Sequence, residues 1–262
     1  SCEEIICKGG IEFVVTNYLK TLNPVTVIGE GATELSTIID TKKNNLAFGI
    51  SIAHKRPLWV ELELEIESSG HGSVTPLEYA NKEMTLALAN LLNEKQKVVY
   101  NKENKDILRH LADQEGGIQK FVLKHPLIFK PIITPQIRKK PELFALFSNT
   151  ITLTRIESKK GSINQIPQRI TATLDCRILP QGSSQDFIQS LNDALDNEDI
   201  RIKIIKEVQQ SNLSNSNDPL YKNMESAIKN QYPDADVFPI ILPVYNDVGW
   251  FRMYNIEGFS VI

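Results

Sequence analysis

Ser69-Gly70-His71-Gly72-Ser73-Val74-Thr75-Pro76 follows directly after a run, residues 59–67, in which apolar and charged side chains alternate. Apolar residues fall at 60, 62, 64 and 66 and glutamates at the odd positions from 61, which is the two-residue period of a half-buried strand. His71 lies between two glycines, where the backbone can turn sharply and a ligand can approach closely. A helix is predicted to start at once, because Thr75 suits the N-cap and Pro76 the first helical position. His71 is therefore expected at a strand-to-helix junction, either as a functional group or as a simple turn residue.

Further strands and helices are predicted downstream of this junction. Runs of β-branched and alternating apolar residues predict strands at about 150–156, 168–179 and 200–208. One helix is predicted over 76–93, and a second follows Ser183 or Ser184. The residues expected to face the core are Leu77, Ala80, Met84, Leu88, Leu91, Ile170, Ala172, Leu174, Cys176, Ile178, Phe187, Leu191 and Leu195. The order β-α-(insertion)-β-β-α-β predicts a ferredoxin-like unit, an antiparallel four-stranded sheet with two helices on one face.

The two ends of the chain predict a different kind of layer. Helices are predicted at 9–20, 218–231 and 247–255, and short apolar strands at 25–28, 46–52, 237–244 and 258–262. Alternation of helices with buried strands is typical of a doubly wound α/β sheet. The predicted fold class is thus α/β plus α+β. Residues 1–57 and 210–262 would form two parts of an incomplete α/β domain, and 58–209 an inserted ferredoxin-like domain with a helical insertion near 99–147.

The composition is that of a soluble globular protein. The chain has 262 residues, 41% hydrophobic and 23% charged, with a net charge of −3. Charges of both signs are scattered, so we expect neither a nucleic-acid partner nor a membrane partner, and no apolar run is long enough to span a bilayer. Three cysteines at no zinc-finger spacing favour a reducing, cytoplasmic location, although export with free thiols stays open. The chain starts without methionine, and both ends are expected to be parts of a longer protein.

Two adjacent carboxylates near the start of the chain are candidate functional groups. Glu3 and Glu4 precede an apolar stretch and a predicted helix, so they are expected on a loop at the carboxyl end of a strand, where open α/β sheets place their sites. In a metal site, one such carboxylate can bind the cation while the other takes a proton from metal-bound water.

Several stretches together resemble one enzyme family. They are Ser1-Cys2-Glu3-Glu4, Val27-Ile28-Gly29-Glu30-Gly31-Ala32, Ser69-Gly70-His71-Gly72-Ser73, Ile163-Asn164-Gln165-Ile166-Pro167 with Asp175-Cys176-Arg177-Ile178-Leu179-Pro180, and, more weakly, Asn246-Asp247-Val248-Gly249-Trp250-Phe251-Arg252. In order and spacing they resemble the di-zinc exopeptidases, the family of aminoacylases, glutamate carboxypeptidases and succinyl-diaminopimelate desuccinylases. The branch with Gly-X carboxypeptidase and the secreted N-acyl-amino-acid synthase/hydrolases is the most similar. The resemblance implies a hydrolase with two zinc ions and a ferredoxin-like lid that forms homodimers.

The resemblance also implies roles for individual residues. Glu3 would be the general base and Glu4 a zinc ligand. His71 would polarise the scissile carbonyl in the active site of the partner subunit. Asn164 and Arg177 would bind the carboxylate or carbonyl oxygens of a peptide or N-acyl amino acid, although Arg177 could instead form a surface ion pair with Asp175.

The chain departs from the family pattern at the metal site. Cys2 replaces an aspartate, and Gly29 stands where the family has a ligand aspartate. Glu30 could substitute for that ligand, but a shift of one residue re-aims a side chain. The family's first metal-binding segment would lie before residue 1, and its last histidine ligand would lie after residue 262. Since zinc needs about four donors, this chain is not expected to hold a catalytic metal by itself.

Two hypotheses follow. In the first, the chain is part of a zinc-dependent metallopeptidase or amidohydrolase, a carboxypeptidase or an aminoacylase, that cleaves an amide bond with metal-activated water. In the second, it is a degenerate, non-catalytic family member that dimerises or binds a ligand. A dimer is expected to form through an edge strand at about 200–208 or 149–157 and its neighbouring helix, because the glutamates of strand 59–67 would repel their counterparts.

Overall fold

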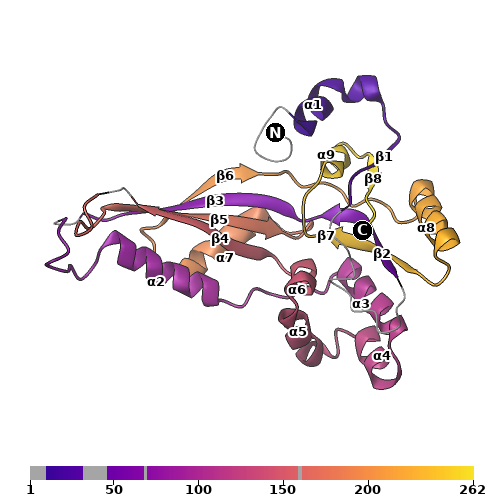
Figure 1. The fold of residues 1–262 in the computed structure, drawn as a ribbon, viewed down its shortest axis with the longest axis horizontal. Helices are drawn as coiled ribbons and strands as arrows, with labels where there is room; N and C mark the ends of the chain where they lie inside the picture. The colour runs from indigo at the N-terminus through magenta and orange to yellow at the C-terminus, as the bar shows by residue number, and fades with distance from the viewer. Residues whose placement is uncertain (1–9, 32–45, 68–69, 159–160) are drawn as a thin grey trace. The chain divides into compact units, whose positions relative to one another are not determined.

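A computed structural model describes residues 10–31, 46–67, 70–158 and 161–262 (Figure 1). The chain divides into two compact units. The first, called here the mixed unit, comprises 1–56, 97–148 and 209–262, and the second, the two-layer unit, comprises 57–96 and 149–208. The helical stretch 97–148 therefore groups with the mixed unit, whereas we assigned it to the ferredoxin-like domain from the sequence. The functional meaning of these boundaries stays a prediction.

The two-layer unit has the predicted strand and helix order. Its elements are β3 (Arg56–Glu65), α2 (Ala80–Asn93), β4 (Thr150–Ser158), β5 (Arg169–Ile178), α7 (Ser184–Leu195) and β6 (Arg201–Glu207). The strands form one sheet in the order β4-β5-β3-β6. β4 pairs antiparallel with β5, and β3 pairs antiparallel with β6. The expected antiparallel four-stranded sheet is confirmed, and β4 and β6 are its edges, as the sequence predicted.

One face of this sheet carries both helices. Alternate residues of β3 and β5 pack against α2 and α7 in a single core, which contains Leu58, Val60, Leu62, Leu64, Ala80, Met84, Leu88, Leu91, Ile170, Ala172, Leu174, Cys176, Ile178, Phe187, Leu191 and Leu195. The strand period of two and the helical spacing of three and four residues put these side chains on facing surfaces. All core residues predicted from the sequence are buried except Leu77.

The predicted start of the first helix is wrong. α2 begins at Ala80, after Tyr79, whose backbone is extended and whose side chain makes no capping bond. Leu77 is 89% exposed and Glu78 is also exposed, so the two residues after Pro76 bury no apolar surface that would favour a helix there. The first buried residue of the apolar stripe is Ala80, and the helix starts where burial begins.

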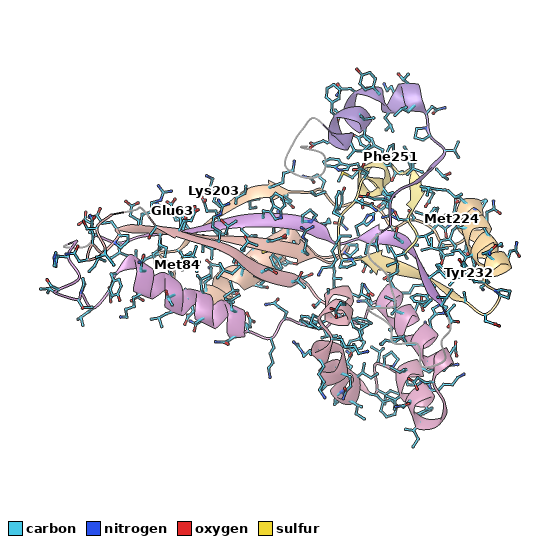
Figure 2. All side chains as sticks on the ribbon, in the orientation of Figure 1. Glu63, Met84, Lys203, Met224, Tyr232 and Phe251 are labelled. Atoms are coloured by element: carbon cyan, nitrogen blue, oxygen red, sulfur yellow. The ribbon has the colours of Figure 1, made fainter. Side chains whose placement is uncertain are left out.

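The other face of the sheet is charged and solvated. Glu63 of β3 bonds Arg169 of β5 and Arg201 of β6, and Glu61 lies 4.0 Å from Lys203. Partial desolvation raises the pKa of Glu63, but the hydrogen bonds and charges of both arginines outweigh it and lower that pKa. Figure 2 shows Glu63 and Lys203 on one side of the sheet and Met84 on the other. Because β3 is a central strand, its glutamates form cross-strand ion pairs and do not protect an edge.

The mixed unit contains short parallel strand pairs. β1 (Thr26–Ile28) pairs with β8 (Glu257–Phe259), and β2 (Ala47–His54) pairs with β7 (Asp236–Leu242), both in parallel. Residues after β8 continue the layer, because Ser51 N–H donates to the carbonyl of Ser260 over 2.8 Å. Assignment of these pairs to a doubly wound sheet stays a prediction.

The helices of the mixed unit are α1 (Ile11–Leu22), α3 (Lys102–Gln114), α4 (Gly117–Lys124), α5 (Lys130–Lys139), α6 (Pro141–Phe147), α8 (Pro219–Gln231) and α9 (Val248–Arg252). α3, α5, α6 and β7 share a core that includes Ile107, Ile137 and Phe238. α3 lies within the helical insertion predicted near 99–147, and Asn101 caps it by accepting from the N–H of Asn104 over 2.8 Å. Within the described part of the chain, no helix is both long and apolar enough to cross a membrane.

Candidate functional site

Two loops at one end of the two-layer sheet hold His71 and Asn164. The N–H of Gly72 donates to the carbonyl of Asn164 over 2.7 Å, and the N–H of Ile166 donates to the carbonyl of Gly70 over 3.0 Å. Gly70 has a φ of +82°, which L-amino acids rarely adopt, and a Cβ at Gly72 would lie 3.3 Å from the Asn164 carbonyl. The glycines on either side of His71 therefore allow the two loops to approach each other.

The side chains of His71 and Asn164 are in contact. Nε2 of His71 lies 2.8 Å from the side-chain amide of Asn164. The backbone N–H of Ser73 donates to Nδ1 over 3.1 Å, so Nδ1 carries a lone pair and the neutral ring carries its proton on Nε2. The Ser73 hydroxyl, 2.6 Å from Nδ1, then donates to the same atom. The structure places Nδ2 of Asn164 toward Nε2. A protonated Nε2 needs an acceptor, so we assign the amide oxygen to this position, because amide orientation follows the hydrogen-bond network.

This pair can bind an oxygen acceptor. His71 and Asn164 are exposed, and both carry N–H groups at the end of the sheet. A carbonyl or carboxylate oxygen could replace the Asn164 oxygen at Nε2 and accept from the asparagine NH₂ as well. Donors fixed in advance stabilise negative charge that develops on such an oxygen. The sequence resemblance identified both residues, and the structure brings them together.

Arg177 lies far from this pair. It is on β5, eight residues beyond Arg169, so the strand rise of about 3.3 Å per residue separates these two positions by about 26 Å. The loop of His71 and Asn164 adjoins the Arg169 end, since the N–H of Ile66 donates to Gln168. Arg177 forms a two-pronged ion pair with Asp175, at 2.7 and 2.9 Å. One chain therefore does not bring Arg177 and His71 into one site, and the substrate role of Arg177 stays a prediction.

The metal-ligand candidates do not form a centre. Glu3 and Glu4 lie outside the described residues. Glu30 is exposed, and its backbone carbonyl accepts from the Asn246 amide over 2.7 Å. Among the residues that the structure describes, no three His, Cys, Asp or Glu side chains could hold a metal ion together. The described residues thus do not fit a zinc site, and the roles of the three glutamates stay predictions.

The position of the expected aspartate ligand is sterically closed. A Cβ atom added to Gly29 would lie 2.1 Å from Cγ2 of Val248, and one added to Gly258 would lie 2.4 Å from Cγ1 of the same valine. Real Cβ atoms essentially never make such contacts. Val248 therefore occupies the volume between two glycines, and an aspartate at position 29 does not fit without movement of the valine.

A buried arginine connects four segments of the mixed unit. Arg252 is 1% exposed. Its guanidinium donates to the Ser214 hydroxyl (2.9 Å), the Gly258 carbonyl (2.6 Å), the Ser51 carbonyl (2.9 Å) and Nδ1 of His54 (2.8 Å). Burial lowers the pKa of Arg252. We did not predict these contacts, because a single arginine or histidine in an apolar context gives no sequence signal for its partners.

His54 is held neutral beside this arginine. Burial first, and the charge of Arg252 second, lower the pKa of His54 well below 6.5. Since Nδ1 accepts from Arg252, the proton of the neutral ring is on Nε2, and that buried nitrogen makes no hydrogen bond to any residue that the structure describes. The ring packs edge-to-face with Tyr245 at 5.7 Å between centroids. His54 is therefore a buried, neutral histidine whose role is to accept a hydrogen bond from Arg252 and to pack in the core.

We expect acid to destabilise the mixed unit through His54. In the unfolded chain His54 binds a proton below about pH 6.5, whereas the native ring does not. The unfolded state then holds more protons, so the free energy of unfolding should fall by up to about 1.4 kcal/mol per pH unit below that value. Urea unfolding at several pH values should show this slope, and His54→Asn should reduce it. The slope that remains should come partly from His110, whose pKa burial also lowers. An unchanged slope in His54→Asn would contradict the assignment.

The fold and the loops define a class of protein: an α+β two-layer unit, inserted in a mixed α/β unit, that presents a histidine–asparagine pair. The peptidase dimerisation domain of the M20 family matches residues 52–203. This match covers more than half of the sequence, and the chain belongs to the M20 peptidase family.

Curated relatives agree with this assignment at low identity. The probable carboxypeptidase S-like 2 of Dictyostelium discoideum is 25% identical over 213 residues, which cover 80% of this chain and 40% of that protein. The N-fatty-acyl-amino acid synthase/hydrolase PM20D1 of Mus musculus is 22% identical over 214 residues, covering 80% of this chain and 42% of that protein. The chain thus spans about two fifths of the length of these relatives.

Solved structures share the fold. The M20 family metallo-carboxypeptidase Sso-CP2 from Sulfolobus solfataricus matches with a TM-score of 0.59 at 21% identity, over 97% of this chain and 67% of that one. The di-peptidase Dug1p from Saccharomyces cerevisiae matches with a TM-score of 0.63 at 13% identity, over 95% of this chain and 55% of that one.

Proposed function

We propose that the chain is the substrate-binding and dimerising part of an M20-type amide hydrolase, a carboxypeptidase or an N-acyl-amino-acid hydrolase. The observation that carries this proposal is the contact of His71 with Asn164 at 2.8 Å, on loops that project from the two-layer sheet. Both residues supply N–H donors, which is what a scissile carbonyl oxygen needs as its negative charge develops. The relatives that are named carboxypeptidase and N-acyl-amino-acid hydrolase support the substrate class.

The proposal includes a homodimer. Strand β5 separates Arg177 by about 26 Å from Arg169, which lies at the end of the strand that adjoins His71. One substrate can therefore meet His71 and Arg177 only if they come from different chains. A two-fold arrangement supplies this, because it brings the end loops of each chain to the other and closes after two copies. The match to a peptidase dimerisation domain supports such an assembly. β4 and β6 offer the unpaired edges through which it would form.

The described residues do not supply the metal chemistry of this hydrolysis. M20 relatives include a metallo-carboxypeptidase, but the part of this chain that the structure describes contains no cluster of potential metal ligands. We therefore assign no catalytic step to a metal in this chain. Its own residues bind and orient the substrate oxygens.

A second candidate function is supported by the packing at Gly29. Val248 fills the space that a ligand aspartate would need, and Cys2 also departs from the family pattern. Under this alternative the chain is a degenerate family member that dimerises or binds a ligand without catalysis. Sequencing of the gene on both sides of this segment separates the two functions. A reading frame that encodes the further metal ligands supports an enzyme, and an intact frame without them supports the alternative.

We expect the 262-residue chain to retain little zinc and to show no hydrolysis of N-acyl amino acids or dipeptides. The physical reason is the number of donors, because zinc binding needs about four and the described residues provide no such group. Elemental analysis after dialysis, with an activity assay in added zinc, tests this expectation. Zinc that survives dialysis in near-stoichiometric amount, together with turnover, would contradict it.

A further inference from the structure

Helices α4 and α5, with the loop between them, expose a group of large apolar side chains. Ile118 is 83% exposed and Ile128 is 71% exposed, and three neighbours are more than half exposed. We call these five residues the α4–α5 surface: Ile118, Phe121, Leu127, Ile128 and Ile132. Single exposed apolar residues are ordinary, but a group within one short segment marks an interaction surface.

These side chains are not part of the core that folds the helices. Other residues of the same segment supply the core contacts. Those that pack with α3, α6 and β7 are Val122, Leu123, Phe129, Ile133 and Ile137. The exposed ring of Phe121 contacts two rings of the loop between α4 and α5. The distances between ring centroids are 4.7 Å to His125 and 5.7 Å to Phe129. The side chains of the α4–α5 surface are therefore exposed, and the described residues do not bury them in the core of the unit.

The charge of this segment is one-sided. From Gly117 to Lys140 the chain contains no Asp or Glu, and its basic residues are Lys120, Lys124, Lys130, Arg138, Lys139 and Lys140. Asp113 of α3 is the carboxylate beside Lys120 and Lys124, at 3.3 and 3.0 Å, so one negative charge serves two lysines. Lys130 and Arg138 also lie over the rings of Tyr100 and Phe144. The segment is thus a positive, apolar region in a chain whose net charge is −3.

We propose that the α4–α5 surface binds the surface of a membrane that contains anionic lipids. Exposed Ile, Leu and Phe side chains enter the boundary between headgroups and acyl chains, while the lysines reach the negative headgroups. A protein partner fits this composition less well, because lysine is depleted in the cores of protein interfaces. The expectation of no membrane partner was based on the charge of the whole chain. That average conceals the local positive charge of this segment.

Co-sedimentation with lipid vesicles tests the proposal. We expect the 262-residue chain to bind phosphatidylcholine vesicles that contain phosphatidylserine more tightly than pure phosphatidylcholine vesicles, and to bind less in high salt. The double variant Ile118→Ser/Phe121→Ser should bind the anionic vesicles at least about tenfold more weakly. Lys139→Glu/Lys140→Glu should cause a similar loss. Val25→Ser is the matched control, since Val25 is 88% exposed in the same unit, and it should bind like the wild type.

Other outcomes overturn the proposal. The first is that the chain binds neutral and anionic vesicles equally well. The second is that both double variants bind anionic vesicles as tightly as the wild type. The chain could also self-associate in the absence of vesicles. If Ile118→Ser/Phe121→Ser abolished that self-association, the surface would be assigned to a second copy of the chain instead. Circular dichroism and thermal unfolding check each variant. If the apolar double variant does not fold, the lysine double variant decides, because its side chains are exposed and contribute nothing to the core.

Discussion

Replacement of Arg252 by methionine is expected to lower the free energy of unfolding of the mixed unit by about 3 kcal/mol. Methionine has a similar length but no donors, so acceptors on Ser51, His54, Ser214 and Gly258 would lose the Arg252 donor. Ser214 and Gly258 keep their hydrogen bonds to each other, so the loss falls mainly on Ser51 and His54. Each buried acceptor left without a donor costs about 1–3 kcal/mol. Removal of a buried charge offsets part of this loss, since the guanidinium is desolvated in the native state.

The two tryptophans allow this effect to be measured in one unit. Trp250 lies in α9 of the mixed unit, and Trp59 lies in β3 of the two-layer unit. In a Trp59→Phe background, urea unfolding followed by fluorescence reports the mixed unit alone. Arg109→Met is the control, because Arg109 forms an exposed ion pair with Asp106 on α3, and it should cost less than about 1 kcal/mol. If Arg252→Met lowered the free energy of unfolding as little as Arg109→Met does, the buried contacts of Arg252 would not stabilise the unit.

The second large effect concerns catalysis and rests on the proposed function. It is to be measured in a form of the protein that hydrolyses an N-acyl amino acid or a dipeptide. We expect His71→Ala to lower kcat by about 10²–10³-fold with little change in KM, because a donor that acts in the transition state is lost. Asn164→Ala should lower kcat by a similar factor. The two losses should not add, since the side chains contact each other at 2.8 Å.

Mixing of subunits tests whether the site is shared between chains. Homodimers of His71→Ala and of Arg177→Ala should each be impaired. A mixed dimer contains one intact site if His71 of one chain acts with Arg177 of the other, so random mixing should restore about a quarter of the wild-type sites. The control mixes His71→Ala with Asn164→Ala, whose residues lie on the same pair of loops, and should restore nothing. Absence of recovery in the first mixture would refute the shared site.

The two-layer unit could be predicted from its sequence because local and tertiary signals agree there. The alternation in β3 and β5 and the helical spacing in α2 and α7 put the same residues into one core. The start of α2 was wrong because capping signals at Thr75 and Pro76 are local, whereas burial begins only at Ala80. The insertion near 99–147 was predicted to be helical, but the bounds of α3 were not, because its polar composition concealed a narrow apolar stripe.

The candidate site was predictable to a smaller extent. The segment around His71 and the segment around Asn164 each carry a recognisable pattern, and strand pairing explains why they meet. The separation of Arg177 from them follows from the length of β5 and from the backbone contact of Ile66 with Gln168, which puts the two loops at the opposite end of that strand. His54 and Arg252 were not predicted, because a buried polar contact is set by segments that are far apart in the chain.

The packing of Val248 between Gly29 and Gly258 has a consequence for substitutions at position 29. An aspartate introduced at position 29 alone would force its Cβ against the valine, so it is tolerated only if Val248 shifts. Replacement of Val248 alone would leave a void between the two glycines and give no functional gain. Each single substitution is therefore unfavourable, whereas an aspartate at position 29 combined with a smaller residue at position 248 would avoid both the clash and the void. The two positions are thus coupled, and the effect of changing one depends on the other.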